Sequence, residues 1–250
     1  GSVPVLQARG ELPQLAAFNP LLGPDLQLGG RLAFDIRREG LLQTTRVSGN
    51  VLGDELAIRD LATGLSLREG VVRMALADQR ISLEQAIFKG GQGSLSAEGT
   101  LDLRGESPSG QVRIEARRLT LFSRSDMLLV LSGNGDLSSR KGQISISGKL
   151  RADQGDIEYR SADIPKLSED VIVIGRERPP AKTLPDFSLA MDVDLGNDFR
   201  FRGYGLDTRL EGLLRLRAQP ARSLSAHGVV QVTEGTYRAW GQRLEIERGQ

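Results

Sequence analysis

Ser138 and Lys141 are the residues whose types and spacing come closest to known catalytic chemistry. They match the Ser-x-x-Lys pattern, in which a serine nucleophile stands at the start of a helix beside a lysine. The residues on both sides alternate between apolar and polar, which is typical of strands. We therefore interpret this pattern as a turn between strands and expect no nucleophile there.

Asp192, Asp194 and the pair Asn197-Asp198 supply oxygen ligands of the kind that Ca²⁺ prefers. The two aspartates alternate with Met191 and Val193, so we expect them on the solvated face of a strand. Asn197-Asp198 is typical of a turn. We therefore expect no metal site.

The composition excludes several further classes of site. The 250 residues contain no cysteine and one histidine, which excludes disulfides, thiolate zinc sites and multi-histidine metal sites. The 33 Lys and Arg balance 32 Asp and Glu, so the net charge of +1 gives no overall attraction to nucleic acid. Nucleotide-binding loops and nucleophile elbows are absent from the sequence. We expect neither enzymatic activity, nor a cofactor, nor a nucleic-acid partner.

A band of arginines stands at alternate strand positions in the last third of the chain. One interpretation is contact with anionic headgroups or with a partner; the other is an ordinary solvated face whose charges discourage edge-to-edge aggregation. We favour the solvated face. The band consists of Arg200, Arg202, Arg209, Arg215 and Arg217.

Strict alternation of apolar and polar residues is the clearest structural signal. Between Phe187 and Leu195 every second residue is apolar, which predicts a strand with one buried face. Only Gln14 to Leu22 favours a helix, of about two turns because of Pro20. The proline-rich stretch 164–185 predicts a loop around one short strand. Similar alternation occurs at 32–36, 72–76, 95–103, 112–116, 144–150, 210–216 and 226–232.

Glycines two residues before an aliphatic residue punctuate these strands. The spacing between Gly135 and Gly155 is too short for helical crossovers. The strands are therefore antiparallel neighbours, or long strands bent at glycine, and the pattern leaves both open. These glycines are Gly93, Gly99, Gly110, Gly135, Gly142, Gly148, Gly155 and Gly228.

The predicted strands need a cover for their apolar faces, and almost no helix is available. The sheet must fold into a sandwich, close into a barrel or curl into a trough. Sandwich cores of this size usually contain several large rings, whereas aromatic residues are 4% of this chain. Contiguous aliphatic walls suit hydrocarbon chains. We therefore predict an all-β fold, and the residues alone leave both an open trough with aliphatic walls and a β-sandwich with an aliphatic core possible.

The C-terminal third resembles the TamB family. The resemblance is carried by residues 192–214 (DVDLGNDFRFRGYGLDTRLEGLL) and 228–249 (GVVQVTEGTYRAWGQRLEIERG), in that order. The glycine ladder from Gly133 to Tyr159 precedes them, and the likeness is strong from about residue 99 onward.

Together with the alternation, this resemblance predicts an elongated, curled antiparallel or mixed sheet with an aliphatic groove, the β-taco of bridge-forming lipid transfer proteins. It implies a periplasmic portion of a protein that is anchored in the inner membrane of a Gram-negative bacterium. The implied partners are phospholipid acyl chains, the outer-membrane barrel TamA and nascent outer-membrane proteins. Residues 1–250 would be one continuous section of the family's longer chain, after a tag remnant at Gly1-Ser2. The stretch associated with TamA would lie mostly beyond Gln250.

The implied function is carriage of phospholipid between the two membranes together with support of outer-membrane protein assembly. The alternative is a chaperone-like module that pairs a sheet edge with nascent barrel strands, without lipid transport. In the first case each groove residue would contact acyl chains. The predicted groove residues are Leu101, Leu103, Ile144, Ile146, Leu150, Phe187, Leu189, Met191, Val193, Leu195, Phe199, Phe201, Leu214, Leu216, Val230 and Val232.

Overall fold

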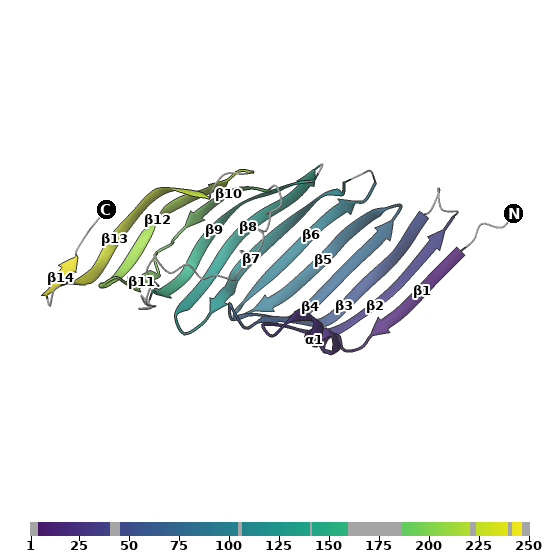
Figure 1. Ribbon diagram of the computed structural model, residues 1–250, viewed down its shortest axis with the longest axis horizontal. Coiled ribbons are helices and arrows are strands. Elements are labelled where there is room, and N and C mark those ends of the chain that lie inside the picture. The colour runs from purple at the N-terminus through teal and green to yellow at the C-terminus, as the bar shows by residue number, and fades with distance from the viewer. Residues whose placement is uncertain are drawn as a thin grey trace, which may run out of the picture.

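The described residues of the computed structural model form one sheet of 14 strands, confirming the all-β prediction. Description covers residues 5–40, 46–104, 107–140, 142–159, 187–220, 224–239 and 242–246. Figure 1 shows the strands side by side along an elongated molecule, with β1 near one end and β14 near the other. The predicted loop 164–185 lies outside the described residues.

Most of the strands are long, and nearly all pair with their neighbours in the sequence. The order is β1 to β10, then β12, β13 and β14, while β11 pairs with β9 and β12. The strands are β1 (Val5–Leu12), β2 (Leu26–Glu39), β3 (Arg46–Asp60), β4 (Leu65–Ala77), β5 (Arg80–Gly90), β6 (Gly93–Asp102), β7 (Ser109–Ser123), β8 (Met127–Arg140), β9 (Gln143–Glu158), β10 (Phe187–Asp194), β11 (Phe199–Gly203), β12 (Leu206–Ala218), β13 (Ser225–Ala239) and β14 (Gln242–Ile246).

Among the described strands, parallel pairing occurs only at β9. β10 and β11 both pair with β9 in parallel, one along each half of that long strand. The other pairings between the described strands are antiparallel. Parallel neighbours need a crossover connection, and here it would run through residues 160–186, outside the described part of the chain.

The predicted helix is split into two very short elements, η1 (Leu15–Phe18) and α1 (Asn19–Leu22). Pro20 stands in the first turn of α1, where its missing N–H removes no helical hydrogen bond. The Asn19 side chain accepts a hydrogen bond from the Leu28 amide at 2.8 Å, which ties the segment to β2. No helix in the described residues is long and apolar enough to span a membrane.

Bulges bend the strands of this sheet. The register shifts in the pairings of β2 with β3, β3 with β4, β4 with β5, β5 with β6, β7 with β8, β8 with β9, and β12 with β13. Glu55, Glu69 and Arg118 take positive φ values of 52°, 52° and 46° at three of these shifts. An extra residue on one strand of a pair bends that strand and increases its twist.

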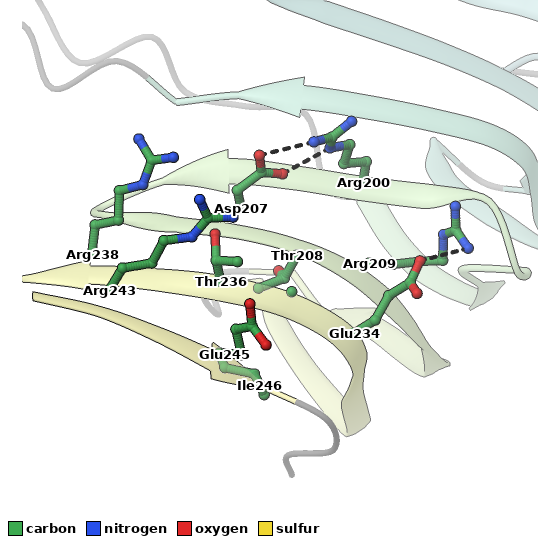
Figure 2. Close-up of a pocket in the computed structure, with 11 residues that line it drawn as sticks. Arg200, Asp207, Thr208, Arg209, Glu234, Thr236, Arg238, Arg243, Glu245 and Ile246 are labelled. Atoms are coloured by element: carbon green, nitrogen blue, oxygen red, sulfur yellow. Dashed lines mark hydrogen bonds and ion pairs between the residues drawn. The ribbon is translucent and has the colours of Figure 1, made fainter.

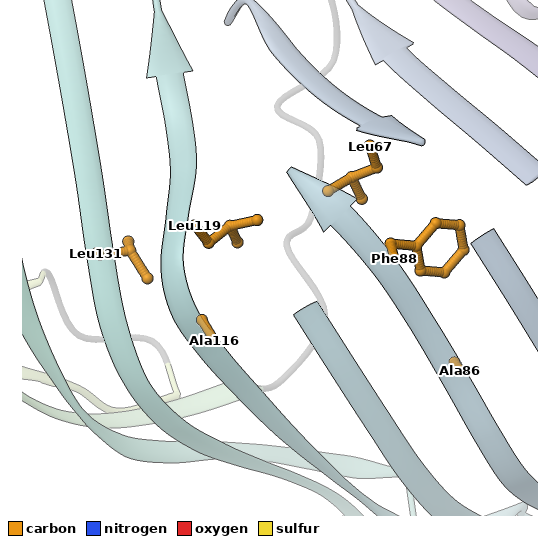
Figure 3. Packing of buried hydrophobic residues seen from close by; sticks show 6 residues of the cluster. All are labelled: Leu67, Ala86, Phe88, Ala116, Leu119 and Leu131. Atoms are coloured by element: carbon orange, nitrogen blue, oxygen red, sulfur yellow. The ribbon is translucent and has the colours of Figure 1, made fainter. Parts of the chain in front are cut away.

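A cluster of buried hydrophobic residues lies where the sheet curls around the β5–β6 hairpin. Leu67 on β4, Phe88 on β5 and Leu119 on β7 are 6%, 8% and 4% exposed. Figure 3 shows Leu119 extending from β7 toward Leu67. The apolar face therefore lies on the inside of the bend, and the cluster stabilises a sheet that has no second layer among the described elements. Its buried members are Leu67, Ala86, Phe88, Ala116, Leu119 and Leu131.

The curl also brings two turns together at one rim. The Ser123 amide at the end of β7 donates a hydrogen bond to the Thr63 carbonyl in the β3–β4 turn, at 3.2 Å. The Arg124 guanidinium donates to the Ala62 carbonyl at 3.0 Å. β4 and β7 thus meet beyond the tip of the shorter β5–β6 hairpin.

Candidate functional site: the apolar face of the sheet

An unbroken row of directly paired apolar residues crosses the sheet from β1 to β12. Each member is the register partner of the next, so all their side-chain positions lie on one face. Every member is aliphatic, aromatic, methionine or glycine. The row is Gly10, Phe34, Val51, Met74, Leu83, Gly99, Val112, Leu137, Ile146, Leu189 and Ala218.

Further rows on the same face contain most of the predicted groove residues. Leu101 pairs with Gly110, and Ile144 pairs with Phe187. The remaining partners in this half of the sheet are Leu150 with Val193 and Val193 with Leu214, Met191 with Leu216, Phe199 with Gly155 and Leu210, Phe201 with Ile157 and Thr208, Val230 with Gly212, and Val232 with Leu210.

Two predicted groove residues lie outside the strands. Leu103 follows β6 and is 42% exposed, with its amide bonded to the Gln79 carbonyl. Leu195 follows β10 and is 7% exposed, and its amide donates to the Gly212 carbonyl at 2.9 Å. The structure therefore does not bring Leu103 into the paired rows, because the strand ends at Asp102.

Glycines on this face leave room that neighbouring side chains occupy. A Cβ on Gly10 would lie 2.5 Å from the Phe34 ring, and one on Gly155 would lie 2.3 Å from the Phe199 ring. At Gly133, with φ of +149°, it would lie 2.1 Å from the Lys149 carbonyl oxygen. Neighbouring strands and rings approach these backbones too closely for any larger residue.

None of the elements in the described part of the chain covers the apolar face. The helices of the described residues have four residues each, which is too little to cover a face of this length. Most side chains of the long apolar row are half-buried, and Leu137 is 36% exposed. A contiguous exposed apolar surface of this extent is typical of an interaction site.

The opposite face is polar and rich in ion pairs. Asp192 and Asp194, predicted on a solvated face, are paired with Arg217 at 3.2 Å and with Arg151 at 4.0 Å. Ser138 is in β8, so it does not begin a helix, and Lys141 lies outside the described residues. The expected turn is therefore wrong for Ser138, which lies in the strand, whereas Asp192 and Asp194 are on the solvated face as predicted.

The arginine band also lies on this polar face, and most of its members have carboxylate partners. Arg200 binds Asp207 at 2.8 Å, and Arg209 binds Glu234 at 2.8 Å. Arg202 binds Asp156 at 2.7 Å. These contacts agree with the interpretation of a solvated, charge-balanced face.

A single curled sheet with one open apolar face and one charged face places the chain among elongated, groove-forming β proteins. The family model of the TamB C-terminal domain matches residues 82–250. The chain belongs to the TamB family. It is 24% identical over 272 residues to the translocation and assembly module subunit TamB of Haemophilus influenzae, covering 91% of this chain and 20% of that protein. The chain thus spans about a fifth of the length of this relative. No solved structure matches the chain.

Proposed function

We propose that this chain is a section of a periplasmic groove that carries phospholipid acyl chains between the inner and outer membranes. It would act in the translocation and assembly module, within an inner-membrane-anchored protein that works with TamA. The observation that carries this proposal is the paired apolar row from Gly10 to Ala218, which supplies a hydrocarbon surface without a charged residue.

The physical argument is one of transfer free energy. Each methylene that leaves a bilayer for water loses about 0.8 kcal/mol, so a two-chain lipid needs continuous apolar contact along its path. The rows of the apolar face supply that contact from strand to strand. Charged pairs on the opposite face keep the exterior hydrated. The residues have no chemical role beyond apolar contact.

A charge placed on the apolar face tests this function. We expect Leu189→Glu to lower the amount of phospholipid bound by the purified chain about tenfold or more, because an ionised carboxylate is unfavourable beside acyl chains. Binding is measured by native mass spectrometry and by the fluorescence of a labelled phospholipid. Val193→Arg supplies a second variant with the opposite charge.

The matched control is Ala190→Glu. Ala190 is exposed, and its register partners Arg217 and Ser147 place it on the polar face one residue from Leu189. We expect this variant to bind lipid as the wild type does. Equal binding by Leu189→Glu and Ala190→Glu, with both variants folded, would overturn the groove proposal. If Leu189→Glu loses phospholipid binding but still supports outer-membrane protein assembly, the result would favour the strand-pairing module instead.

A further inference from the structure

A pocket of about 500 Å³ lies on the polar face, between β11 and β14. Figure 2 shows it as a group of arginine and acidic side chains on neighbouring strands. Asp207 pairs with Thr236, and Thr236 pairs with Glu245, so these positions share one face of the sheet. The charged side chains at these positions therefore lie on the face opposite the apolar face.

Two of the four arginines in the pocket are neutralised. Arg200 donates two hydrogen bonds of 2.8 Å to the Asp207 carboxylate, one to each oxygen. Arg209 forms an ion pair with Glu234 at 2.8 Å. Both carboxylates are thereby engaged by one guanidinium each.

The other two arginines of the pocket are Arg238 and Arg243. They are direct register partners on β13 and β14, and both are exposed. Within the described ranges neither forms an ion pair. Like charges directly opposite each other destabilise a strand pair, so this arrangement is unfavourable for the sheet alone. An anion between the two guanidinium groups would remove that repulsion.

The acidic side chains nearby do not supply the anion between Arg238 and Arg243. The pKa of Asp207 is lowered first by its hydrogen bond to Arg200 and further by the charges of Arg202 and Arg238, so this carboxylate already has a surplus of cations around it. Glu245 lies opposite Thr236, and Figure 2 shows the Arg243 guanidinium on the Asp207 side of that threonine. Four arginines thus face three carboxylates in this pocket, and Arg238 and Arg243 are the two without an ion pair to a described residue.

We propose that Arg238 and Arg243 bind the phosphate group of a phosphate-bearing ligand in this pocket. Guanidinium groups present paired N–H donors that match phosphate oxygens, and two of them opposite each other form a clamp. The Thr236 hydroxyl lies in the same pocket and supplies a further donor. The phosphate could belong to a lipid headgroup at a membrane surface or to a soluble phosphate compound, and the two share this chemistry.

Two probes separate these sources. Pyrophosphate is titrated into the purified chain by calorimetry, and binding to phosphatidylcholine vesicles is compared with and without phosphatidic acid. Saturable binding of pyrophosphate supports a soluble ligand, and binding to phosphatidic acid vesicles alone supports a headgroup. Absence of both would overturn the proposal.

The variant is Arg238→Gln combined with Arg243→Gln. Since a hydrogen bond to a charged group contributes about tenfold or more in affinity, we expect the double variant to lose at least that factor for the probe that binds. Its urea midpoint should not fall, because the substitutions remove a repulsion. Wild-type affinity in the double variant would overturn the proposal.

Arg73→Gln is the matched control. Arg73 is exposed on β4 opposite Leu52 and Gln85, and it too has no ion pair with a described residue. It tests whether any unpaired arginine of this sheet attracts the probe. We expect no change in binding. A loss equal to that of the double variant would show general attraction to charge and would overturn the assignment to Arg238 and Arg243.

Discussion

Leu119 on β7 lies over Gly90 on β5, although β6 separates these two strands in the sheet. A Cβ on Gly90 would lie 2.4 Å from Leu119 Cδ1 and 3.1 Å from Leu67 Cδ2. Leu67 is the register partner of Gly90 on the adjacent strand, whereas Leu119 reaches this glycine from two strands away because the bulged strands curl toward the apolar face. The bend therefore requires a residue without a side chain at position 90.

Gly90→Ala should destabilise the chain. The new methyl group would displace Leu119, which is 4% exposed and has little room to move, and overpacking of this kind costs about 1–3 kcal/mol. Urea unfolding measures the change in the free energy of unfolding. Gly135→Ala is the control, because a Cβ there would meet only the Ser147 carbonyl oxygen at 3.6 Å. Equal effects in the two variants would contradict the packing that we describe.

Leu119→Ala should lower the free energy of unfolding by about 2–5 kcal/mol, the usual range for a leucine truncated in a core. Leu213→Ala is the comparison, since Leu213 is 58% exposed, and a surface change of this kind stays within about 0.5 kcal/mol. Chemical denaturation of both variants gives the difference. A small effect at Leu119 would mean that the cluster does not stabilise the sheet.

Asp60→Ala should loosen the contact between β4 and β7. The Asp60 side chain accepts hydrogen bonds from the Ala62 amide and the Thr63 hydroxyl, both at 2.9 Å, and so shapes the turn that accepts the Ser123 amide. We expect faster hydrogen exchange at Ser123 and a loss of about 1–2 kcal/mol.

Asp54→Ala is suited as the control for this turn, because Asp54 contacts Arg31 at 3.8 Å on the exposed face. Unchanged exchange at Ser123 in Asp60→Ala would show that the rim contact forms without the turn. Faster exchange in both variants would show a general loss of stability rather than a local one.

Acid should weaken the fold through Asp102. The Arg104 side chain and amide donate hydrogen bonds to Asp102, and these hold its pKa well below the usual value. A lowered pKa in the folded state means that the unfolded chain binds more protons, so this stabilisation is complete above about pH 4 and is lost as pH falls further.

Unfolding of wild type and Asp102→Asn between pH 7 and pH 2 measures this contribution. We expect the variant to be the less stable protein at pH 7 and the difference to shrink in acid. The difference should also shrink in 1 M salt, because the groups are near the surface. A difference that is constant with pH would contradict a role for the charge of Asp102.

The alternation of apolar residues predicted the strands and which residues of a strand share a face. It placed Ile144, Ile146 and Leu150 on one face, and β9 has them there. Strand periodicity is a local property, so one stretch of sequence suffices to predict it. The register that joins these residues to Phe187 and Leu189 depends on distant pairings, and no local pattern encodes it.

The sequence left open whether the glycines of the ladder stand in turns between strands or within long strands. Gly142 stands in the turn between β8 and β9, with φ of +79°, while Gly148 and Gly155 lie within β9. Both expected arrangements therefore occur. A glycine before an aliphatic residue looks the same in either, and only the partner strand distinguishes them.

The bulges could not be predicted. Between Ala116 and Leu119 two residues separate apolar positions, and the same interruption could end a strand. The structure instead continues β7 through Arg117 and Arg118 to Ser123. The curl that depends on such bulges, and with it the depth of the groove, lies beyond what periodicity indicates.

Nearly every strand of this sheet is hydrogen-bonded to the strands that precede and follow it in the sequence. Insertion of one further antiparallel hairpin would lengthen the molecule by about 10 Å and leave the cross-section unchanged. In such an architecture the length of the molecule can change by one hairpin at a time, as in a repeat protein, because no central core is shared by all the strands. The distance that a member of the family can bridge would then follow from its number of strands.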